Sequence, residues 1–291
     1  MTPASYAMDA AIRIRFAIGL GAIASVALFG SADGPTSRNT AIVAEARTGE
    51  VWKQRHAALV ERAKKGNADV VFAGDSLTQR WEAEGKTVWD EAFAAWKPAN
   101  LGISGDRTQH LLWRLSIGQE LAGLDPKVIV LLVGTNNLGS NSPAEIAAGV
   151  RAVVAECRRQ KPKAQILLLG LFPRSGRPVA EGAEFAPALG LNSKFAETNT
   201  RLQKLEDETA VTFLDIGEKF LDQKGNLLAT LMPDFLHLSP EGYRVWAANL
   251  RQPVEQLLSG KPSPRRAAKR AERRVDGLRG RLMMWVSSGG R

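Results

Sequence analysis

Short runs of apolar residues constrain the fold of this chain most strongly. Residues Val128–Val133 are apolar without interruption, and Val70–Ala73 and Ile166–Leu169 repeat that pattern. A strand that is apolar on both faces is typical of a parallel sheet with helices on either side. Helical segments separate the runs, so the chain predicts an α/β fold, a three-layer sandwich around a five-stranded parallel sheet. The expected strands are Val70–Gly74, Pro98–Ile103, Val128–Gly134, Gln165–Leu171 and Val211–Asp215.

The helices expected between these strands carry recognisable starts. Ser142 and Pro143 predict a helix start, because serine caps the first N–H groups and proline suits the first turn. Ser239-Pro240-Glu241 gives the same signal for the last helix. The segment Phe172–Leu189, rich in Pro, Gly and Arg, predicts a long loop. The expected helices cover Glu50–Lys65, Val88–Trp96, Thr108–Leu115, 142–160, Asn192–Leu205 and Tyr243–Leu258.

The N-terminal stretch has the pattern of an export signal. Arg13 and Arg15 precede an apolar run, Phe16–Gly30, which small residues follow. This arrangement predicts a signal peptide over 1–32, since the run of about 15 residues is shorter than the roughly 20 that a membrane span needs. An uncleaved membrane anchor is the alternative. We expect an exported protein, periplasmic or secreted, with no stable membrane span after cleavage.

The charge of the chain is concentrated at its C-terminal end. The net charge is +9, and Lys261–Arg291 holds ten Lys and Arg against two acidic residues. The basic character therefore describes a tail and says little about a substrate. We expect a linker over 33–48, one folded domain over 49–259 and a tail over 260–291. A disordered tail is favoured over a helix bound to anionic lipid or nucleic acid, and no nucleic-acid partner is expected.

The numbers and spacing of cysteine and histidine residues argue against an internal disulfide and against a zinc site. The single cysteine, Cys157, cannot form an internal disulfide, and its helical spacing with Val153 and Val154 predicts a position in the core. The three histidines form no His-Glu-x-x-His motif, and there are no paired cysteines. The sequence therefore gives no support for a zinc site.

A serine follows the first predicted strand directly. Gly74 permits a sharp turn, and Leu77–Trp81 can begin a helix, so Ser76 is expected at the carboxyl end of a strand. Ligands bind at this edge in open α/β sheets. Ser76 is therefore a candidate nucleophile, provided that a histidine takes its proton. The alternative is an ordinary helix N-cap.

A histidine and an aspartate lie in the predicted loop just before the last helix. His237 can accept the proton of Ser76 and later deliver it to a leaving alcohol. Asp234, three residues earlier, can hold the imidazole N–H in a turn, which fixes the tautomer and stabilises the imidazolium. The alternative is that this Asp-x-x-His pattern serves only as a capping arrangement.

Acyl transfer also needs hydrogen-bond donors for the oxyanion that forms on the attacked carbonyl. The candidates are the N–H groups of Ser76 and Gly105 and the side-chain amide of Asn136. Because the carboxyl ends of parallel strands share one edge of a sheet, we expect these groups to converge with Asp234 and His237. The alternatives are a plain turn at Gly105 and a loop residue at Asn136 that satisfies backbone groups.

The combination of these residues resembles the GDSL, or SGNH, hydrolases. The matching blocks occur in the family's order: Gly74–Leu77, Gly102–Asp106, Gly134–Asn137 and Asp234–His237. Within the family, the chain is most similar to the catalytic subunits of platelet-activating factor acetylhydrolase 1b and their bacterial relatives. The similarity covers about Glu50–Leu258, and the segments that carry it are Gly105–Leu115, Val133–Asn137 and Leu169–Arg174.

The resemblance implies both a fold and a set of site residues. The implied fold is a flavodoxin-like sheet. The implied triad is Ser76, His237 and Asp234, and the implied oxyanion hole consists of Ser76, Gly105 and Asn136. The family uses no metal and no cofactor, so neither is expected here.

The resemblance also implies a small acyl pocket. Leu77, Thr135 and Leu236 fall at positions that line this pocket in the acetylhydrolases. Bulky side chains there would favour acetyl over long acyl groups. Core packing is the alternative for Leu77 and Leu236.

Together these features predict a serine esterase that removes short acyl groups, with acetyl expected first, through an acyl-enzyme. The export signal favours an acetylated sugar or lipid, in carbohydrate or in the cell envelope, as the ester substrate. An SGNH-type O-acyltransferase and a non-catalytic binder of an anionic polymer are the alternatives, and a homodimer stays open. Arg174 and Arg177 of the long loop are expected to meet solvent in preference to an anionic substrate.

Overall fold

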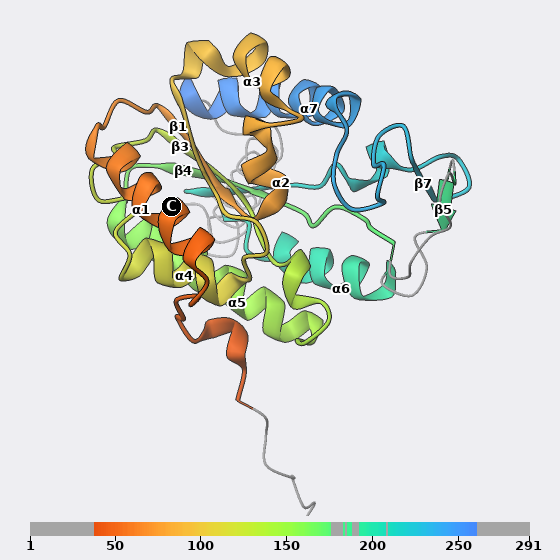
Figure 1. The fold of residues 1–291 in the computed structure, drawn as a ribbon, viewed down its shortest axis with the longest axis horizontal. Helices are drawn as coiled ribbons and strands as arrows, with labels where there is room; N and C mark the ends of the chain where they lie inside the picture. The colour runs from red at the N-terminus through yellow and green to blue at the C-terminus, as the bar shows by residue number, and fades with distance from the viewer. Residues whose placement is uncertain (1–37, 176–182, 184, 188–191, 208, 261–291) are drawn as a thin grey trace, which may run out of the picture. The chain divides into compact units, whose positions relative to one another are not determined.

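The computed structural model describes residues 38–175, 183, 185–187, 192–207 and 209–260. The predicted signal peptide, the basic tail and Arg177 lie outside these residues. No helix in the described ranges combines the length and the apolar character that a membrane crossing requires. Figure 1 shows the ribbon, in which helices cover both faces of a central sheet.

The central sheet has five parallel strands in the order β2-β1-β3-β4-β6. This order matches the flavodoxin-like arrangement, so the predicted fold class is confirmed. Val70, the first residue of β1, pairs with Pro98 of β2 on one side and with Val128 of β3 on the other. The strands are β1 (Val70–Gly74), β2 (Pro98–Gly102), β3 (Val128–Leu132), β4 (Gln165–Leu169) and β6 (Val211–Leu214).

The core explains why the strand sequences are apolar. Every residue of β1 and β3 is buried, because helices cover both faces of the sheet. Helices α3 (Lys86–Phe93) and α7 (Pro240–Leu258) pack together on one face. The other face carries α4 (Thr108–Ser116), α5 (Pro143–Gln160) and α6 (Asn192–Gln203), with α1 (Glu50–Lys64) beside α4.

The two predicted serine caps are confirmed. The Ser142 hydroxyl accepts a hydrogen bond from the Glu145 N–H at 3.3 Å, and the Ser239 hydroxyl accepts one from the Gly242 N–H at 3.1 Å. Each cap satisfies an N–H group that the first turn of a helix leaves without a partner. The Ser239 cap ends the loop that contains Asp234 and His237, so it fixes where α7 begins.

A small second sheet occupies part of the region expected to be one long loop. β5 (Phe185–Pro187) pairs antiparallel with β7 (Asn226–Leu228). Each strand has three residues, which is too short for an alternating pattern to be recognised. Their pairing joins distant parts of the chain, so no local signal predicts it.

The folded unit begins earlier than the expected boundary at residue 49. Asn39 onward belongs to the same unit as the sheet, so residues 39–48 of the expected linker are part of the domain. Ala41 is buried, and its carbonyl accepts a hydrogen bond from the Thr108 hydroxyl at 2.8 Å. The Glu45 N–H donates to the Gln109 carbonyl at 3.2 Å. The small polar composition suggested a linker, but these bonds attach the segment to α4.

Candidate active site

The end of β1 places Ser76 at the carboxyl edge of the sheet. Ser76 opens the short helix α2 (Ser76–Gln79), and Asp75 is the N-cap, since its carboxylate accepts the Leu77 N–H at 3.1 Å. The cap role considered for Ser76 therefore belongs to Asp75. A Cβ on Gly74 would lie 2.3 Å from the carbonyl oxygen of Leu132, so only glycine permits this close approach of the two strands.

The structure joins Ser76 to the two other members of the expected triad. Nε2 of His237 lies 3.0 Å from Oγ of Ser76, and Nδ1 of His237 lies 2.6 Å from Oδ2 of Asp234. Both distances are those of hydrogen bonds. The Ser76 side chain is nearly buried, whereas the His237 side chain is 18% exposed and that of Asp234 is 55% exposed. The three residues form a continuous hydrogen-bonded line that opens to solvent at the aspartate.

The loop that carries Asp234 and His237 is held by hydrogen bonds between the Asp234 side chain and backbone N–H groups of the same loop. Oδ1 of Asp234 accepts the N–H groups of Leu236 and His237 at 3.0 and 2.6 Å. Phe235 has a φ of +54°, a strained value for a large side chain, and its carbonyl accepts the Ser175 N–H at 2.9 Å. The capping role suggested for the Asp-x-x-His pattern is therefore present, together with the ring contact to His237.

The charge of Asp234 follows from these contacts. Partial burial by itself raises the pKa of Asp234, but the hydrogen bonds from the ring and backbone of His237 outweigh it. The net result is a pKa below the ordinary aspartate value. Asp234 is therefore an anion at neutral pH, as a partner for an imidazolium must be.

Helix α7 also contacts the serine segment directly. The hydroxyl of Tyr243, a fully buried residue, donates to the carbonyl of Leu77 at 2.7 Å. The His237 loop leads into α7, so this bond connects the histidine segment to the helix that Ser76 opens. The role of Tyr243 could not be predicted from the sequence, because a tyrosine on the apolar side of a helix is an ordinary core residue.

The expected oxyanion donors Gly105 and Asn136 lie on neighbouring loops. Gly105 has a φ of +79° in a turn closed by the Asp106 N–H, which donates to the Ile103 carbonyl at 3.2 Å. This geometry is that of a type II turn, which favours glycine at the third position. The Asn136 side-chain amide donates to the Asp106 carbonyl at 2.9 Å. Gly105 thus has the turn role considered for it, and Asn136 is tied to the same turn.

The three expected pocket residues differ in exposure. Leu77 is buried and belongs to the main hydrophobic core, while Leu236 is half-buried beside His237. Thr135 is buried, and its hydroxyl has no hydrogen-bond partner among the described residues. Leu77 therefore has the core role that was its alternative, and Leu236 is the member that is partly accessible.

Two charged residues near the triad have altered pKa values. The pKa of the Asp75 carboxyl is raised to about 7, mainly because burial disfavours its charged form. The nearby Asp106 adds to this increase, while the Leu77 N–H and Arg114 oppose it. Burial lowers the pKa of Arg174, while Asp234 and Asp75 act in the opposite direction. Arg174 is half-buried near these carboxylates, so the expectation of a solvated side chain does not hold for it.

Other reactive groups do not compete with Ser76 in the described part of the chain. Cys157 is buried, and burial raises the pKa of its thiol to about 12, so it stays a protonated core residue. Among the described residues, no three His, Cys, Asp or Glu side chains are grouped as a metal site.

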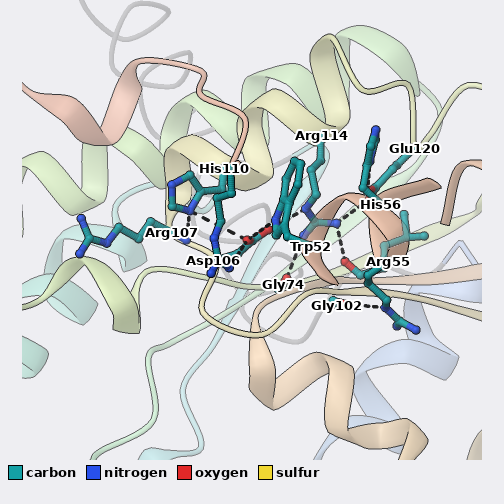
Figure 2. A network of polar contacts seen from close by, with 12 residues as sticks. Trp52, Arg55, His56, Gly74, Gly102, Asp106, Arg107, His110, Arg114 and Glu120 are labelled. Carbon is teal, nitrogen blue, oxygen red and sulfur yellow. Dashed lines mark hydrogen bonds and ion pairs between the residues drawn. The ribbon is translucent and has the colours of Figure 1, made fainter. Parts of the chain in front are cut away.

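A buried ionic cluster beside the site was not predicted. Arg114, Asp106 and Glu120 are fully buried, and Arg114 forms ion pairs with both acids. Figure 2 shows the three side chains together. The available signal was the position of Arg114 three residues after Leu111, on the buried side of the helix. An arginine at such a position needs acidic or carbonyl partners.

Comparisons with known proteins identify the family of this chain. The model of a family described as GDSL-like lipase/acylhydrolase matches residues 72–245. The chain belongs to this family. This GDSL-family chain is 36% identical over 218 residues to platelet-activating factor acetylhydrolase IB subunit alpha2 of Gallus gallus, covering 75% of the chain and 89% of the relative. It is 34% identical over 209 residues to the alpha1 subunit of Homo sapiens, covering 72% and 84%.

A solved structure gives the same fold. A GDSL-like lipase from Bacteroides thetaiotaomicron superposes with a TM-score of 0.54 at 19% identity, covering 71% of this chain and 96% of that one. The predicted resemblance to the GDSL hydrolases and to the acetylhydrolase subunits is confirmed. Membership of this family makes the chain a carboxylic ester hydrolase.

Proposed function

We propose that this chain is a serine esterase that hydrolyses short acyl esters, acetyl esters first, through an acyl-enzyme on Ser76. One observation carries the proposal. Oγ of Ser76 lies 3.0 Å from Nε2 of His237, whose Nδ1 lies 2.6 Å from Asp234. A serine with a base in hydrogen-bond reach, and a base oriented by a third group, is the arrangement of an activated nucleophile.

The first half-reaction is acylation of the serine. Oγ of Ser76 attacks the carbonyl carbon of the ester while Nε2 of His237 takes the hydroxyl proton. The Asp234 carboxylate holds the Nδ1 hydrogen and stabilises the imidazolium. The same Nε2 proton then passes to the leaving alcohol, and the acyl group stays on Ser76.

The second half-reaction releases the acid. His237 takes a proton from water, the resulting hydroxide equivalent attacks the acyl carbon, and Oγ of Ser76 leaves with the proton from Nε2. Both half-reactions place negative charge on the former carbonyl oxygen. The donors proposed for that charge are the N–H groups of Ser76 and Gly105 and the second amide hydrogen of Asn136. Ser76 suits this role because N–H groups in the first turn of a helix lack helical partners.

The exposure of the triad favours hydrolysis over transfer to a sugar hydroxyl. The side chain of Asp234 is 55% exposed and that of His237 is 18% exposed. Bulk water therefore reaches the residues that would activate the second nucleophile. An acyltransferase has to limit this access, because water competes with the acceptor.

Two features support acetyl as the acyl group. Several curated relatives are acetylhydrolases by name, and the half-buried Leu236 lies next to His237. A bulky side chain at that position leaves little room for a long chain. The predicted export signal adds the final part of the proposal, which is an acetylated carbohydrate or cell-envelope ester as the substrate outside the cytoplasm.

The direct test is hydrolysis of p-nitrophenyl acetate by the wild-type chain and by Ser76→Ala. The matched control is Ser259→Ala, since the Ser259 hydroxyl donates only to the Gln256 carbonyl at the end of α7. The proposal expects wild-type activity in the control and near-background rates in Ser76→Ala. Equal rates in all three proteins would reject Ser76 as the nucleophile.

The substrate class needs a separate measurement. Acetate release from acetylated polysaccharides, acetylated envelope glycans and acetylated phospholipids can be compared at equal enzyme concentration. The proposal expects the carbohydrate or envelope esters to be preferred. A preference for phospholipid would reject that part of the proposal and leave the esterase assignment intact.

A further inference from the structure

Next to the two strand ends that lead to Ser76 and Gly105, one arginine is wholly enclosed by protein. Arg114 extends from α4, and its side chain and those of its partners Asp106 and Glu120 are all 0% exposed. Figure 2 shows the guanidinium among these residues. Removing charged groups from water costs free energy that ion pairs only partly return, so the cluster calls for an explanation beyond filling space.

The Arg114 guanidinium holds the carboxyl ends of two neighbouring strands. Nη2 donates to the carbonyl of Gly74 at 3.0 Å, and Nη1 donates to the carbonyl of Leu101 at 2.9 Å. Gly74 is two residues before Ser76, and Leu101 is four residues before Gly105. One planar group therefore fixes the spacing between the strand that leads to the nucleophile and the strand that leads to an expected oxyanion donor.

Asp106 connects the guanidinium to the loop after a third strand. Its carboxylate accepts hydrogen bonds from Arg114 Nε at 2.7 Å and from Trp52 Nε1 at 2.8 Å. Its backbone carbonyl accepts the side-chain amide of Asn136 at 2.9 Å. Asn136 follows β3. Because Asp106 bonds to both Arg114 and Asn136, a shift of the guanidinium would move Asp106 and with it the Asn136 amide. The second hydrogen of that amide can point toward a substrate oxygen.

Glu120 and His56 hold the guanidinium from the other side. Oε2 of Glu120 accepts a hydrogen bond from Nη1 of Arg114, and Oε1 of Glu120 lies 2.7 Å from Nδ1 of His56. The His56 ring stacks on Trp52 with a centroid separation of 5.5 Å. The guanidinium is thus fixed by acids on both sides and has little freedom to rotate.

We propose that Arg114 is a positioning residue that sets the geometry of the oxyanion hole through Asp106 and Asn136. The inference rests on the proposed function, because it concerns the donors of the same reaction. Arginine suits the role because its planar guanidinium offers five N–H donors in fixed directions, whereas a lysine ammonium is a point charge. Oxyanion donors stabilise charge that exists only in the transition state, so displacing them lowers kcat and leaves KM nearly unchanged.

The test compares Arg114→Met with the wild-type chain on p-nitrophenyl acetate. Methionine keeps apolar bulk and removes every donor. The inference expects kcat to fall about 100-fold, as for loss of an oxyanion donor, with KM within about two-fold. An unchanged kcat would overturn it, and so would a loss that appears only as a raised KM.

A double-mutant cycle tests the route through Asn136. If Arg114 acts through this amide, Arg114→Met combined with Asn136→Ala loses less than the product of the two single effects. Fully multiplicative losses would show that the two residues act independently, which overturns the proposed route.

Two further variants separate positioning from stability. Trp52→Phe keeps a smaller aromatic ring and removes the Nε1 donor to Asp106, so it tests the cluster even where Arg114→Met does not fold. We expect a 3- to 10-fold lower kcat at unchanged KM, a size typical of the net contribution of one hydrogen bond. Val150→Ala creates a cavity at a buried residue of α5, a helix that contributes no residue to the cluster, and we expect it to lower the melting temperature at constant kcat. An equal loss of kcat in Val150→Ala would mean that stability alone explains the effect.

A crystal structure of Arg114→Met, or of Trp52→Phe if the former does not fold, distinguishes a failure of this inference from a failure of the proposed function. The inference expects the bond between the Asn136 amide and the Asp106 carbonyl to lengthen or break, with the contact of Ser76 to His237 retained. An unchanged Asn136 would overturn the inference whatever the activity. A wild-type chain as inactive as Ser76→Ala would instead refute the proposed function, and the position of Asn136 would still decide the inference.

Discussion

Nε2 of His237 lies within 3.0 Å of Oγ of Ser76, although 161 positions separate the two residues in the chain. The contact exists because both residues occupy loops at the carboxyl edge of one parallel sheet. Asp75 caps the helix that Ser76 opens. The Asp234 carboxylate holds the loop of His237 by accepting hydrogen bonds from backbone N–H groups of that loop. The relation between a nucleophile and its base is therefore set by topology and completed by local hydrogen bonds.

His237→Ala and Asp234→Ala are expected to impair hydrolysis unequally. His237 is the proton acceptor, whereas Asp234 orients it, and the bond from Ser175 N–H to Phe235 carbonyl still supports the loop in its absence. We expect Asp234→Ala to retain about 10- to 100-fold more kcat than His237→Ala, as for orienting acids in other triads. Steady-state kinetics on p-nitrophenyl acetate measures this. Equal activity in the two variants would contradict the division of roles.

The acyl-chain preference is expected to depend on Leu236. Truncating this half-buried residue beside His237 enlarges the space near the acyl carbon, so Leu236→Ala should raise the butyryl-to-acetyl rate ratio. One or two methylene groups in a pocket typically change selectivity about 10-fold or more. Acetyl, butyryl and octanoyl p-nitrophenyl esters provide the measurement. Leu205→Ala, another partly buried leucine but just after α6, is the control and should leave the ratio unchanged. An octanoyl preference in the wild-type chain would contradict the small pocket.

Asp75 is expected to make stability depend on pH. Burial raises its pKa in the folded chain to about 7, from 3.8 for an exposed aspartate. The folded state thus binds this proton more tightly than the unfolded state, so its stabilising contribution is complete below pH 3.8 and is lost as the pH rises through 7. Asp75→Asn keeps an acceptor for the Leu77 N–H and does not titrate.

The measurement for Asp75 is urea unfolding of both proteins between pH 4 and pH 8. The free energy of unfolding of Asp75→Asn, relative to the wild-type chain, should increase by up to about 4 kcal/mol across this range. A constant difference between the two proteins would show that Asp75 has an ordinary pKa.

Tyr243→Phe is expected to destabilise the domain. The change removes the hydrogen bond that Tyr243 donates to the buried Leu77 carbonyl, and the loss of one such bond typically costs about 1 kcal/mol. Thr212→Val is the matched control, because the Thr212 hydroxyl is buried and has no partner among the described residues. Urea denaturation should show a loss for Tyr243→Phe and little change for Thr212→Val. Similar losses in the two variants would contradict the value given to the hydrogen bond.

Much of the fold and of the triad could be predicted because the relevant signals are local. The continuous apolar segment Val128–Val133 predicts a strand buried on both faces, and Ser142 and Ser239 predict helix starts. Ser76 and His237 could be identified because each is a reactive residue type beside a predicted strand or helix end. Parallel topology then brings such ends to one edge without further information.

Features that depend on distant partners could not be predicted. The position of Arg114 on the buried side of a helix indicates that it needs partners, but not which ones. Two of them are the carbonyls of Gly74 and Leu101, which lie on separate strands. The pairing of β5 with β7 and the packing of Ala41 on α4 are likewise contacts between remote segments. The composition of those short segments resembles that of a loop or linker, so only tertiary structure distinguishes them.

Covalent labelling with a fluorophosphonate tests the central claim most directly, because this reagent phosphonylates a serine that a neighbouring base activates. Peptide mass spectrometry of the labelled wild-type chain should place one adduct on Ser76, with esterase activity lost in step. Ser76→Ala and His237→Ala should remain unlabelled under the same conditions. An adduct on a different residue, or full activity in a chain whose Ser76 is completely labelled, would contradict the account.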